Sequence, residues 1–148
     1  MPVYHISIST VLSLIFLVYF QSVMAAISCL ICGVLIDLDH HLDYFLAKHE
    51  IPWHYRDLVY FGATDKNHKM YLWFHSYESL ILLWGAIYYF NLDIVWVGAA
   101  VGMTVHVLCD QFYNPLHPMV YFLTYRVAQN FSKDKLLAKD FFKKVRPY

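Results

Sequence analysis

The residues best suited to chemistry lie in three short clusters, each beside an apolar stretch. They are Asp37-Leu38-Asp39-His40, His75-Ser76-Tyr77-Glu78 and His106-Val107-Leu108-Cys109-Asp110. Imidazoles and carboxylates are common protein ligands of divalent transition metals. They are also costly inside or beside a lipid bilayer, so three such clusters at helix ends predict one shared metal site.

Two of the clusters have helical spacing. His106 and Asp110 are four residues apart and therefore share a helix face, which lets them chelate one ion; a salt bridge at a helix end is the alternative. His75 and Glu78 are three apart and share a face if their segment is helical. An unpaired carboxylate at the depth of Glu78 is expensive, so we expect Glu78 to bind metal, to hold a ligand in place or to be protonated.

Asp37 and Asp39 flank a single residue at a predicted helix terminus, and His40 adds a nitrogen. Carboxylates so spaced can grip or bridge cations, although charges at a membrane interface are the alternative interpretation. The mixed set favours one or two transition-metal ions, zinc first and then manganese or iron, because calcium prefers oxygen ligands alone. We expect catalytic roles for Asp39 and Glu78.

Composition places the chain in the membrane. Of its 148 residues 59% are hydrophobic, 19% are aromatic and only 15% are charged, which is far from an ordinary soluble domain. The formal net charge of +0 argues against a nucleic-acid partner. These features predict a small integral membrane protein, and they leave a homo-oligomer possible. Membrane lipid is the expected partner because the predicted site lies at headgroup depth.

The apolar segments predict about four transmembrane helices. Residues 6–36 would be about 46 Å long as one helix, too long for a bilayer core of about 30 Å. The polar pair Gln21-Ser22 divides this run, so we expect a hairpin of two spans ending near His41. Residues 70–90 and 94–112 form the third and fourth spans, and a polar connector over 42–69 contains a short helix around 54–61.

A basic tail follows the predicted membrane domain. Residues 119–131 are expected to form a moderately amphipathic helix, which completes a transmembrane domain over 1–131. In residues 132–148, Ser132 is expected to cap a helix with Lys135, Lys139 and Lys143 on one face. This pattern is typical of a helix lying on a membrane surface, and a solvated tail is the alternative.

The distribution of basic residues predicts the orientation. All 11 Lys and Arg residues lie in the connector or from Arg126 onward, so the positive-inside rule places both termini in the cytoplasm. The same topology brings the three clusters to the cytoplasmic face. The expected fold is therefore an all-α polytopic membrane protein with a metal site on its cytoplasmic side and an amphipathic C-terminal tail helix.

With these motifs the chain resembles the small membrane-bound metal-dependent hydrolases, including the LexA-regulated inner-membrane type. The matching residues are His5, the Asp37 cluster, His75-Ser76, and Gly102 with His106, Asp110 and Pro115, over roughly residues 2–120. The resemblance implies that His5 joins Asp37, Asp39, His40, His75, His106 and Asp110 as a metal ligand. Ile36 stands where the family has proline, and the family's His-Arg-Gly is not intact, since His68-Lys69 lies at a longer spacing.

The function expected from these features is hydrolysis of a phosphoester or a lipid ester at the cytoplasmic membrane face. The candidate substrate-binding residues are His68, Asn114 and His117, and for the last two an ordinary loop position is the alternative. A non-enzymatic metal carrier or metal-binding scaffold is the rival function. A carrier would need polar groups continuing across the bilayer, where the sequence offers mainly serines and a threonine.

Overall fold

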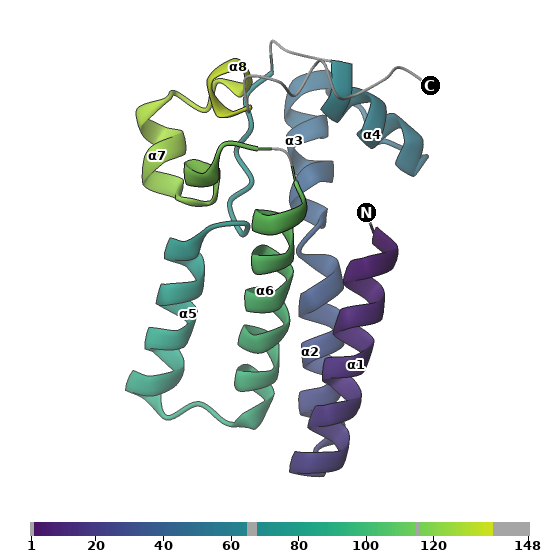
Figure 1. Ribbon diagram of the computed structural model, residues 1–148, viewed down its shortest axis with the longest axis vertical. Helices are drawn as coiled ribbons and strands as arrows, with labels where there is room; N and C mark the ends of the chain where they lie inside the picture. The colour runs from purple at the N-terminus through teal and green to yellow at the C-terminus, as the bar shows by residue number, and fades with distance from the viewer. Residues whose placement is uncertain (1, 65–67, 115, 138–148) are drawn as a thin grey trace.

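The computed structural model describes residues 2–64, 68–114 and 116–137, and in these ranges the protein is all-helical, as predicted. Two antiparallel helix pairs make up most of the molecule, and the short elements gather beyond one end of them (Figure 1). The elements in chain order are α1 (Pro2–Phe20), α2 (Val23–Leu35), α3 (Leu38–Lys48), α4 (Tyr55–Thr64), α5 (Tyr77–Phe90), α6 (Ile94–Tyr113), the 3₁₀ helix η1 (Pro118–Tyr121), α7 (Leu123–Ala128) and α8 (Lys133–Leu136).

The first hairpin turns at the predicted place. Gln21 adopts the left-handed conformation, with φ 50°, and ends α1. The Ser22 hydroxyl then accepts a hydrogen bond from Ala25 N at 3.2 Å and caps the start of α2. The polar pair therefore both breaks the long apolar run and starts the second helix.

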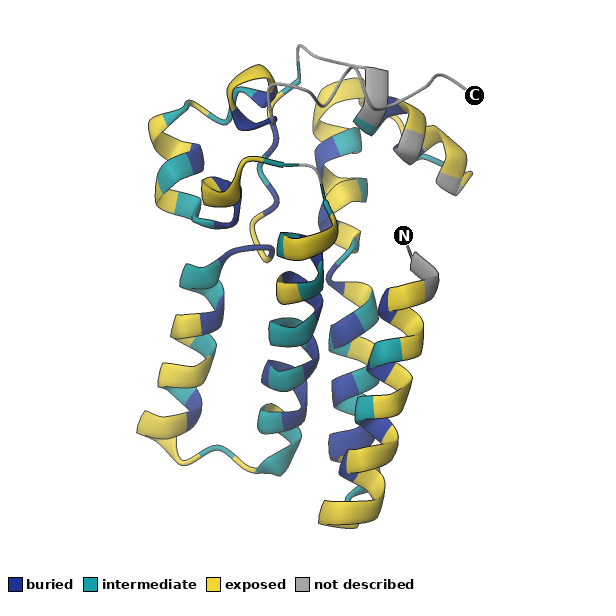
Figure 2. Ribbon diagram, viewed as in Figure 1, coloured by how far each residue is buried: buried dark blue, intermediate teal, exposed yellow. Residues whose placement is uncertain are grey.

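The core lies where α2 packs against α6 and α1. Gly98 and Gly102 of α6 lie against the backbone carbonyls of Ala25 and Cys29 of α2, so closely that a Cβ at either glycine would overlap a carbonyl oxygen. Small residues of this kind let helix backbones approach closely. Figure 2 shows the buried residues on the facing sides of these helices. The contact fixes the end of α2 beside the end of α6.

The second predicted span needs a correction. Helix α2 ends at Leu35, and a turn at Ile36–Asp37 leads into α3, whereas one helix running to His41 was expected. Much of the predicted polar connector is also helical, because α3 continues to Lys48. The short helix expected around 54–61 is present as α4.

The third predicted span is shorter than expected. Helix α5 has 14 residues and begins at Tyr77, after the N-cap Ser76, while the preceding residues from Met70 form no helix. Leu72 in this segment has φ 44°. Two carboxylates of α3 accept its backbone N–H groups: Asp43 from Tyr71 at 2.8 Å, and Asp39 from the segment's last residues. These tertiary hydrogen bonds stabilise a non-helical path for an apolar sequence.

The C-terminal elements also differ from the prediction. The single helix expected over 119–131 is divided into η1 and α7, and α8 has only four residues. Leu136 is buried against Met70, Leu72 and Val120, so the start of the expected tail packs on the domain. Lys139 and Lys143 lie outside the described residues.

Two helical stretches, Val23–Lys48 and Ile94–Tyr113, are long and apolar enough to cross a membrane, judged by length and composition. Residues 4–20 form a shorter apolar helix. Large apolar side chains cover much of the outer surface, and several are more than two-thirds exposed: Val18, Tyr19, Ile81, Leu82, Tyr88 and Tyr89.

Candidate metal centre

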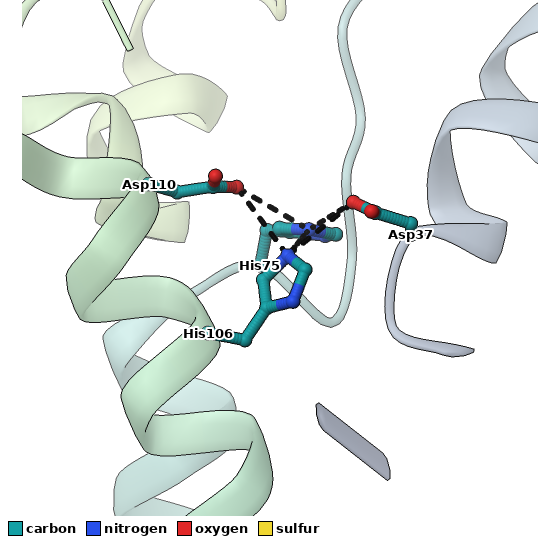
Figure 3. A group of neighbouring side chains, drawn as sticks. All are labelled: Asp37, His75, His106 and Asp110. Atoms are coloured by element: carbon teal, nitrogen blue, oxygen red, sulfur yellow. Dashed lines mark hydrogen bonds and ion pairs between the residues drawn. The ribbon is translucent and has the colours of Figure 1, made fainter. Parts of the chain in front are cut away.

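Four of the predicted ligands meet at the end of the helical pairs. Asp37 comes from the α2–α3 turn, His75 from the segment before α5, and His106 and Asp110 from successive turns of α6 (Figure 3). One ligand atom from each lies within 4.8 Å of the others, a grouping that could hold a metal ion. The sequence therefore identified four residues that the fold brings together from distant positions.

The four ligand atoms form a compact set. His75 Nε2 and His106 Nε2 are 3.3 Å apart. Asp37 Oδ1 lies 3.5 Å from the first of these nitrogens and 3.3 Å from the second. Asp110 Oδ2 lies 3.7 Å and 3.6 Å from them, respectively. Four tetrahedral ligands at zinc–ligand distances of about 2.0–2.1 Å would be separated by roughly 3.3 Å, so the set has the dimensions of a transition-metal site.

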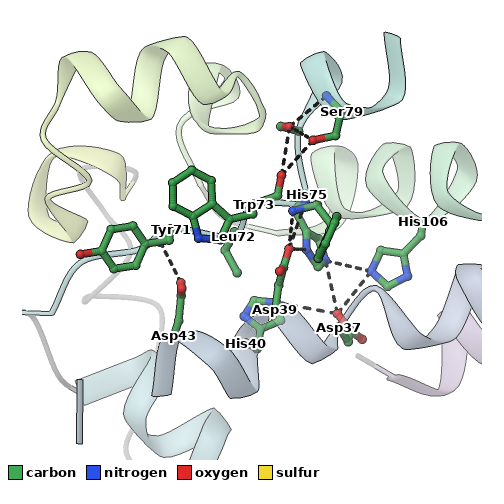
Figure 4. A network of polar contacts seen from close by, with 12 residues as sticks. Asp37, Asp39, His40, Asp43, Tyr71, Leu72, Trp73, His75, Ser79 and His106 are labelled. Atoms are coloured by element: carbon green, nitrogen blue, oxygen red, sulfur yellow. Dashed lines mark hydrogen bonds and ion pairs between the residues drawn. The ribbon is translucent and has the colours of Figure 1, made fainter. Parts of the chain in front are cut away.

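Hydrogen bonds behind the cluster determine how each imidazole is oriented. His106 Nδ1 lies 2.7 Å from the carbonyl oxygen of Gly33. His75 Nδ1 lies 3.2 Å from Asp39 Oδ2, as Figure 4 shows. Because a carbonyl and a carboxylate can only accept, each Nδ1 must donate. Both Nε2 atoms are then available to a metal, and the carboxylate behind His75 is a typical partner of a metal-binding histidine.

This arrangement directs four electron-rich atoms at one another. Neutral His75 and His106 each present an Nε2 lone pair, and the aspartates add carboxylate oxygens. Only a cation or added protons can stabilise such a set. Burial acts to lower the pKa of His75, but hydrogen bonds to Asp37 and Asp39 outweigh it and raise that pKa.

Access differs among the four ligands. The side chains of His75 and His106 are at most 1% exposed and that of Asp110 is 7% exposed, whereas the side chain of Asp37 is 38% exposed. The cluster is therefore closed on the α6 side and open at Asp37. His40 lies at this opening, with Nε2 3.7 Å from Asp37 Oδ1 and a half-exposed ring.

His5 extends the cluster on its buried side. Its Nε2 lies 3.1 Å from Asp110 Oδ1, the oxygen that faces away from the other histidines, and its ring stacks on His106. The resemblance implied that His5 is a metal ligand, whereas the structure places it outside the four-residue centre and beside Asp110. In this geometry His5 orients Asp110, and it would become a ligand only with a second ion on that side.

Asp39 and Glu78, the two expected catalytic residues, lie outside the four-residue centre: Asp39 is behind His75, and Glu78 is at the start of α7. Besides contacting the His75 ring, Asp39 Oδ2 accepts from the backbone N–H groups of Phe74 at 2.6 Å and of His75 at 3.3 Å. Glu78 binds the start of α7, accepting from Leu123 N at 2.8 Å and Thr124 N at 2.9 Å. Glu78 does not share a helix face with His75, because the helix begins after His75.

The three candidate substrate residues lie outside the four-residue centre. His68 stacks on Phe61 of α4. Asn114 donates to the Tyr121 hydroxyl at 3.1 Å. His117 caps η1, accepting from Met119 N at 3.2 Å, and stacks on Tyr125. The last two therefore hold the segment after α6 in place.

Sequence reasoning missed two contributors. The Gly33 carbonyl that orients His106 carries no side-chain signal, although its glycine on an apolar helix indicates close packing. Arg126 was counted only among the basic residues, yet it is fully buried and donates to Leu72 O at 2.7 Å. The available signal was its isolation, since it is the only Lys or Arg between Met70 and Ser132.

No family model, no curated protein and no solved structure matches the chain. The chemistry of the site therefore carries the functional proposal.

Proposed function

We propose that this protein is a membrane-bound metal-dependent hydrolase that cleaves a phosphoester or another ester bond at the membrane surface. The observation that supports it best is the convergence of His75, His106, Asp37 and Asp110 on one point, with both imidazoles held so that Nε2 faces that point. A purely structural polar cluster would be expected to pair donors with acceptors instead.

The fit to a divalent transition metal rests on the donor set and its support. Two imidazole nitrogens and two carboxylate oxygens suit zinc, manganese or iron, and zinc is our first choice. When bound, such an ion polarises an ester and acidifies water at neutral pH. His75 and His106 hold their positions through Asp39 and the Gly33 carbonyl, and Asp110 holds its position through His5.

The opening of the cluster at Asp37 determines where a substrate enters and what His40 can do. A substrate has to approach at Asp37, because the remaining ligands are buried. His40 Nε2 lies at this opening and is placed to take a proton from water or to return one to a leaving group. Burial of His106 and Asp110 keeps water from the other side of the site.

We further propose that α1, α2, α5 and α6 span the membrane with both termini in the cytoplasm. The exposed apolar side chains on the outer faces of these helices support this arrangement, since such a surface is unfavourable in water. The absence of Lys and Arg at Gln21-Ser22 and Asn91-Asp93 supports the orientation. Lipid headgroups then lie level with the site, which favours a lipid or lipid-linked ester.

Purified protein in detergent should hydrolyse a chromogenic phosphate ester when zinc or manganese is supplied, and His106→Ala should lose most of that rate. The metal-carrier alternative has its own readout, zinc uptake into vesicles that contain the protein. Full activity in His106→Ala would contradict the proposal. So would zinc uptake by wild-type protein that hydrolyses neither phosphate nor carboxylic esters.

A further inference from the structure

Arg126 is the largest fully buried side chain in the described residues, with 0% relative exposure. It lies on α7, whose first backbone N–H groups are bound by the Glu78 carboxylate. Burial of a guanidinium is expensive unless its donors are paired. A buried cation beside a candidate metal centre therefore requires an explanation.

Only part of this guanidinium is paired. Nη1 donates to Leu72 O at 2.7 Å, whereas Nε and Nη2 are buried with no hydrogen-bond partner in the described part of the chain. These two nitrogens lie on the same edge of the planar group, the edge that binds carboxylates and phosphates through two parallel hydrogen bonds. The unpaired atoms thus form a complete bidentate fork.

The carboxylates around Arg126 hold its charge without occupying the fork. Burial lowers the pKa of Arg126 below its ordinary value. The nearby charges of Glu78, Asp39 and Asp43 act in the opposite direction and favour the charged guanidinium. The hydrogen bonds of these carboxylates go to other groups. Glu78 accepts from N–H groups and a hydroxyl at the start of α7. Asp39 accepts from N–H groups of the segment before α5 and from the His75 ring, and Asp43 accepts from Tyr71 N. The surrounding carboxylates therefore leave both nitrogens of the fork unpaired in the described part of the chain.

One backbone carbonyl connects Arg126 to the metal cluster. Leu72 O accepts from Arg126 Nη1 at 2.7 Å and from His75 N at 3.1 Å. The guanidinium and the metal-binding imidazole are therefore anchored to the same turn. An anion on the fork would lie in the neighbourhood of the cluster and not at an unrelated surface.

We propose that the Nε and Nη2 edge of Arg126 binds a phosphate group of the molecule processed at the metal cluster. The inference rests on the proposed hydrolase function and narrows it from esters in general to phosphate-bearing substrates. A phosphate offers two oxygens at the spacing of the fork, whereas a neutral carboxylic ester offers no such pair. The phosphate belongs either to a lipid headgroup or to a soluble phosphate ester.

The test measures phosphate binding to the full-length protein in detergent, after removal of metal with a chelator. Inorganic phosphate is titrated and followed by ³¹P NMR line broadening. We expect Arg126→Met and Arg126→Lys to bind phosphate about tenfold more weakly or worse, equivalent to about 1.4 kcal/mol or more, because each loses the pair of parallel hydrogen bonds to the anion. The exposed Arg56 on α4 supplies the control, and Arg56→Met should bind as wild type does.

If Arg126→Met fails to fold, Arg126→Lys tests whether the two parallel N–H groups of Arg126 bind phosphate, because lysine keeps the charge but cannot present such a pair. Equal phosphate affinity in wild type and Arg126→Lys would overturn the proposal, as would no phosphate binding to wild type. A short-chain phosphatidic acid titrated in parallel identifies the source: tighter binding than inorganic phosphate indicates a lipid headgroup, and equal binding a soluble ester.

Metal content of the same preparations separates the two proposals. Phosphate binding without any zinc binding would refute the hydrolase and leave the anion site standing. Zinc binding without phosphate binding would refute the anion site and leave the metal centre standing.

Discussion

Replacing Asp39 with asparagine separates a residue that orients a ligand from one that binds metal. The asparagine side chain would keep a carbonyl oxygen for the N–H groups of Phe74 and His75 but would lose the negative charge behind the imidazole. Partners of this kind typically contribute about 10- to 100-fold in metal affinity, equivalent to about 1.4–2.7 kcal/mol. Because Asp39→Asn retains the hydrogen-bond acceptor, we expect it to weaken zinc binding by about tenfold, near the lower end of this range. Asp39→Ala should weaken zinc binding by about 100-fold, near the upper end.

Competition with a chromophoric zinc chelator measures these affinities. The matched control is Asp43→Asn, one turn further along α3, where the side chain is equally buried and accepts from Tyr71 N but does not contact His75. It should bind zinc within about twofold of wild type, since it does not touch the cluster. The reasoning is refuted if Asp43→Asn weakens zinc binding as much as Asp39→Asn does. A loss in Asp39→Asn as large as in His106→Ala would instead make Asp39 a ligand.

Three further outcomes are expected. Gly102→Ala should push α2 away from α6, lower stability by about 1–3 kcal/mol and weaken zinc binding, whereas Gly85→Ala, with open space around its Cβ position, should not; thermal melts in detergent with and without zinc check both. Because the pKa of His75 is raised in the folded protein, protonation of His75 stabilises the fold at low pH, and this stabilisation is lost as the pH rises through that pKa. Zinc binds the deprotonated ring, so the zinc-induced increase in Tm should grow with pH. An increase in Tm that does not change with pH would contradict this. Reporter tags at residues 1 and 60 should report the cytoplasm and a tag at residue 92 the outside; an external N-terminus would invert the proposed topology.

Local sequence was sufficient for the helices whose ends carry their own signals. Gln21-Ser22 breaks the apolar run because its serine can cap a helix. Helix α6 begins after the N-cap Asp93 and ends at the C-cap Asn114. The cofacial pair His106 and Asp110 was predicted correctly for the same reason, since both residues lie within one uninterrupted helix.

The segment before α5 could not be predicted in this way. Its apolar residues suggest a continuous helix from Met70, but its N–H groups are bound by Asp39 and Asp43 of α3. These carboxylates lie 28 to 36 residues earlier in the chain than the groups they bind. This long-range pairing moves the helix start to Tyr77 and separates His75 from Glu78. Spacing alone therefore suggested a shared role for two residues that the fold uses differently.

The start of the tail shows the same limit. Lysine and leucine at helical spacing predicted a surface helix, yet Lys133 donates to the Gly62 carbonyl at 2.7 Å and Leu136 is buried. Nothing local indicates that α4 and Met70 lie nearby to receive them. The fold of residues 133–137 is thus determined by contacts that only the folded chain creates.

The central claim is that the cluster of Asp37, His75, His106 and Asp110 binds a divalent transition metal. The most direct test is elemental analysis of detergent-purified protein for zinc, manganese and iron, with His75→Ala and His106→Ala beside the exposed control His54→Ala. The account predicts at least one ion per chain in wild type and in His54→Ala, and loss of most metal in the two cluster variants. Metal-free wild type after zinc loading, or unchanged metal content in His75→Ala and His106→Ala, would contradict it.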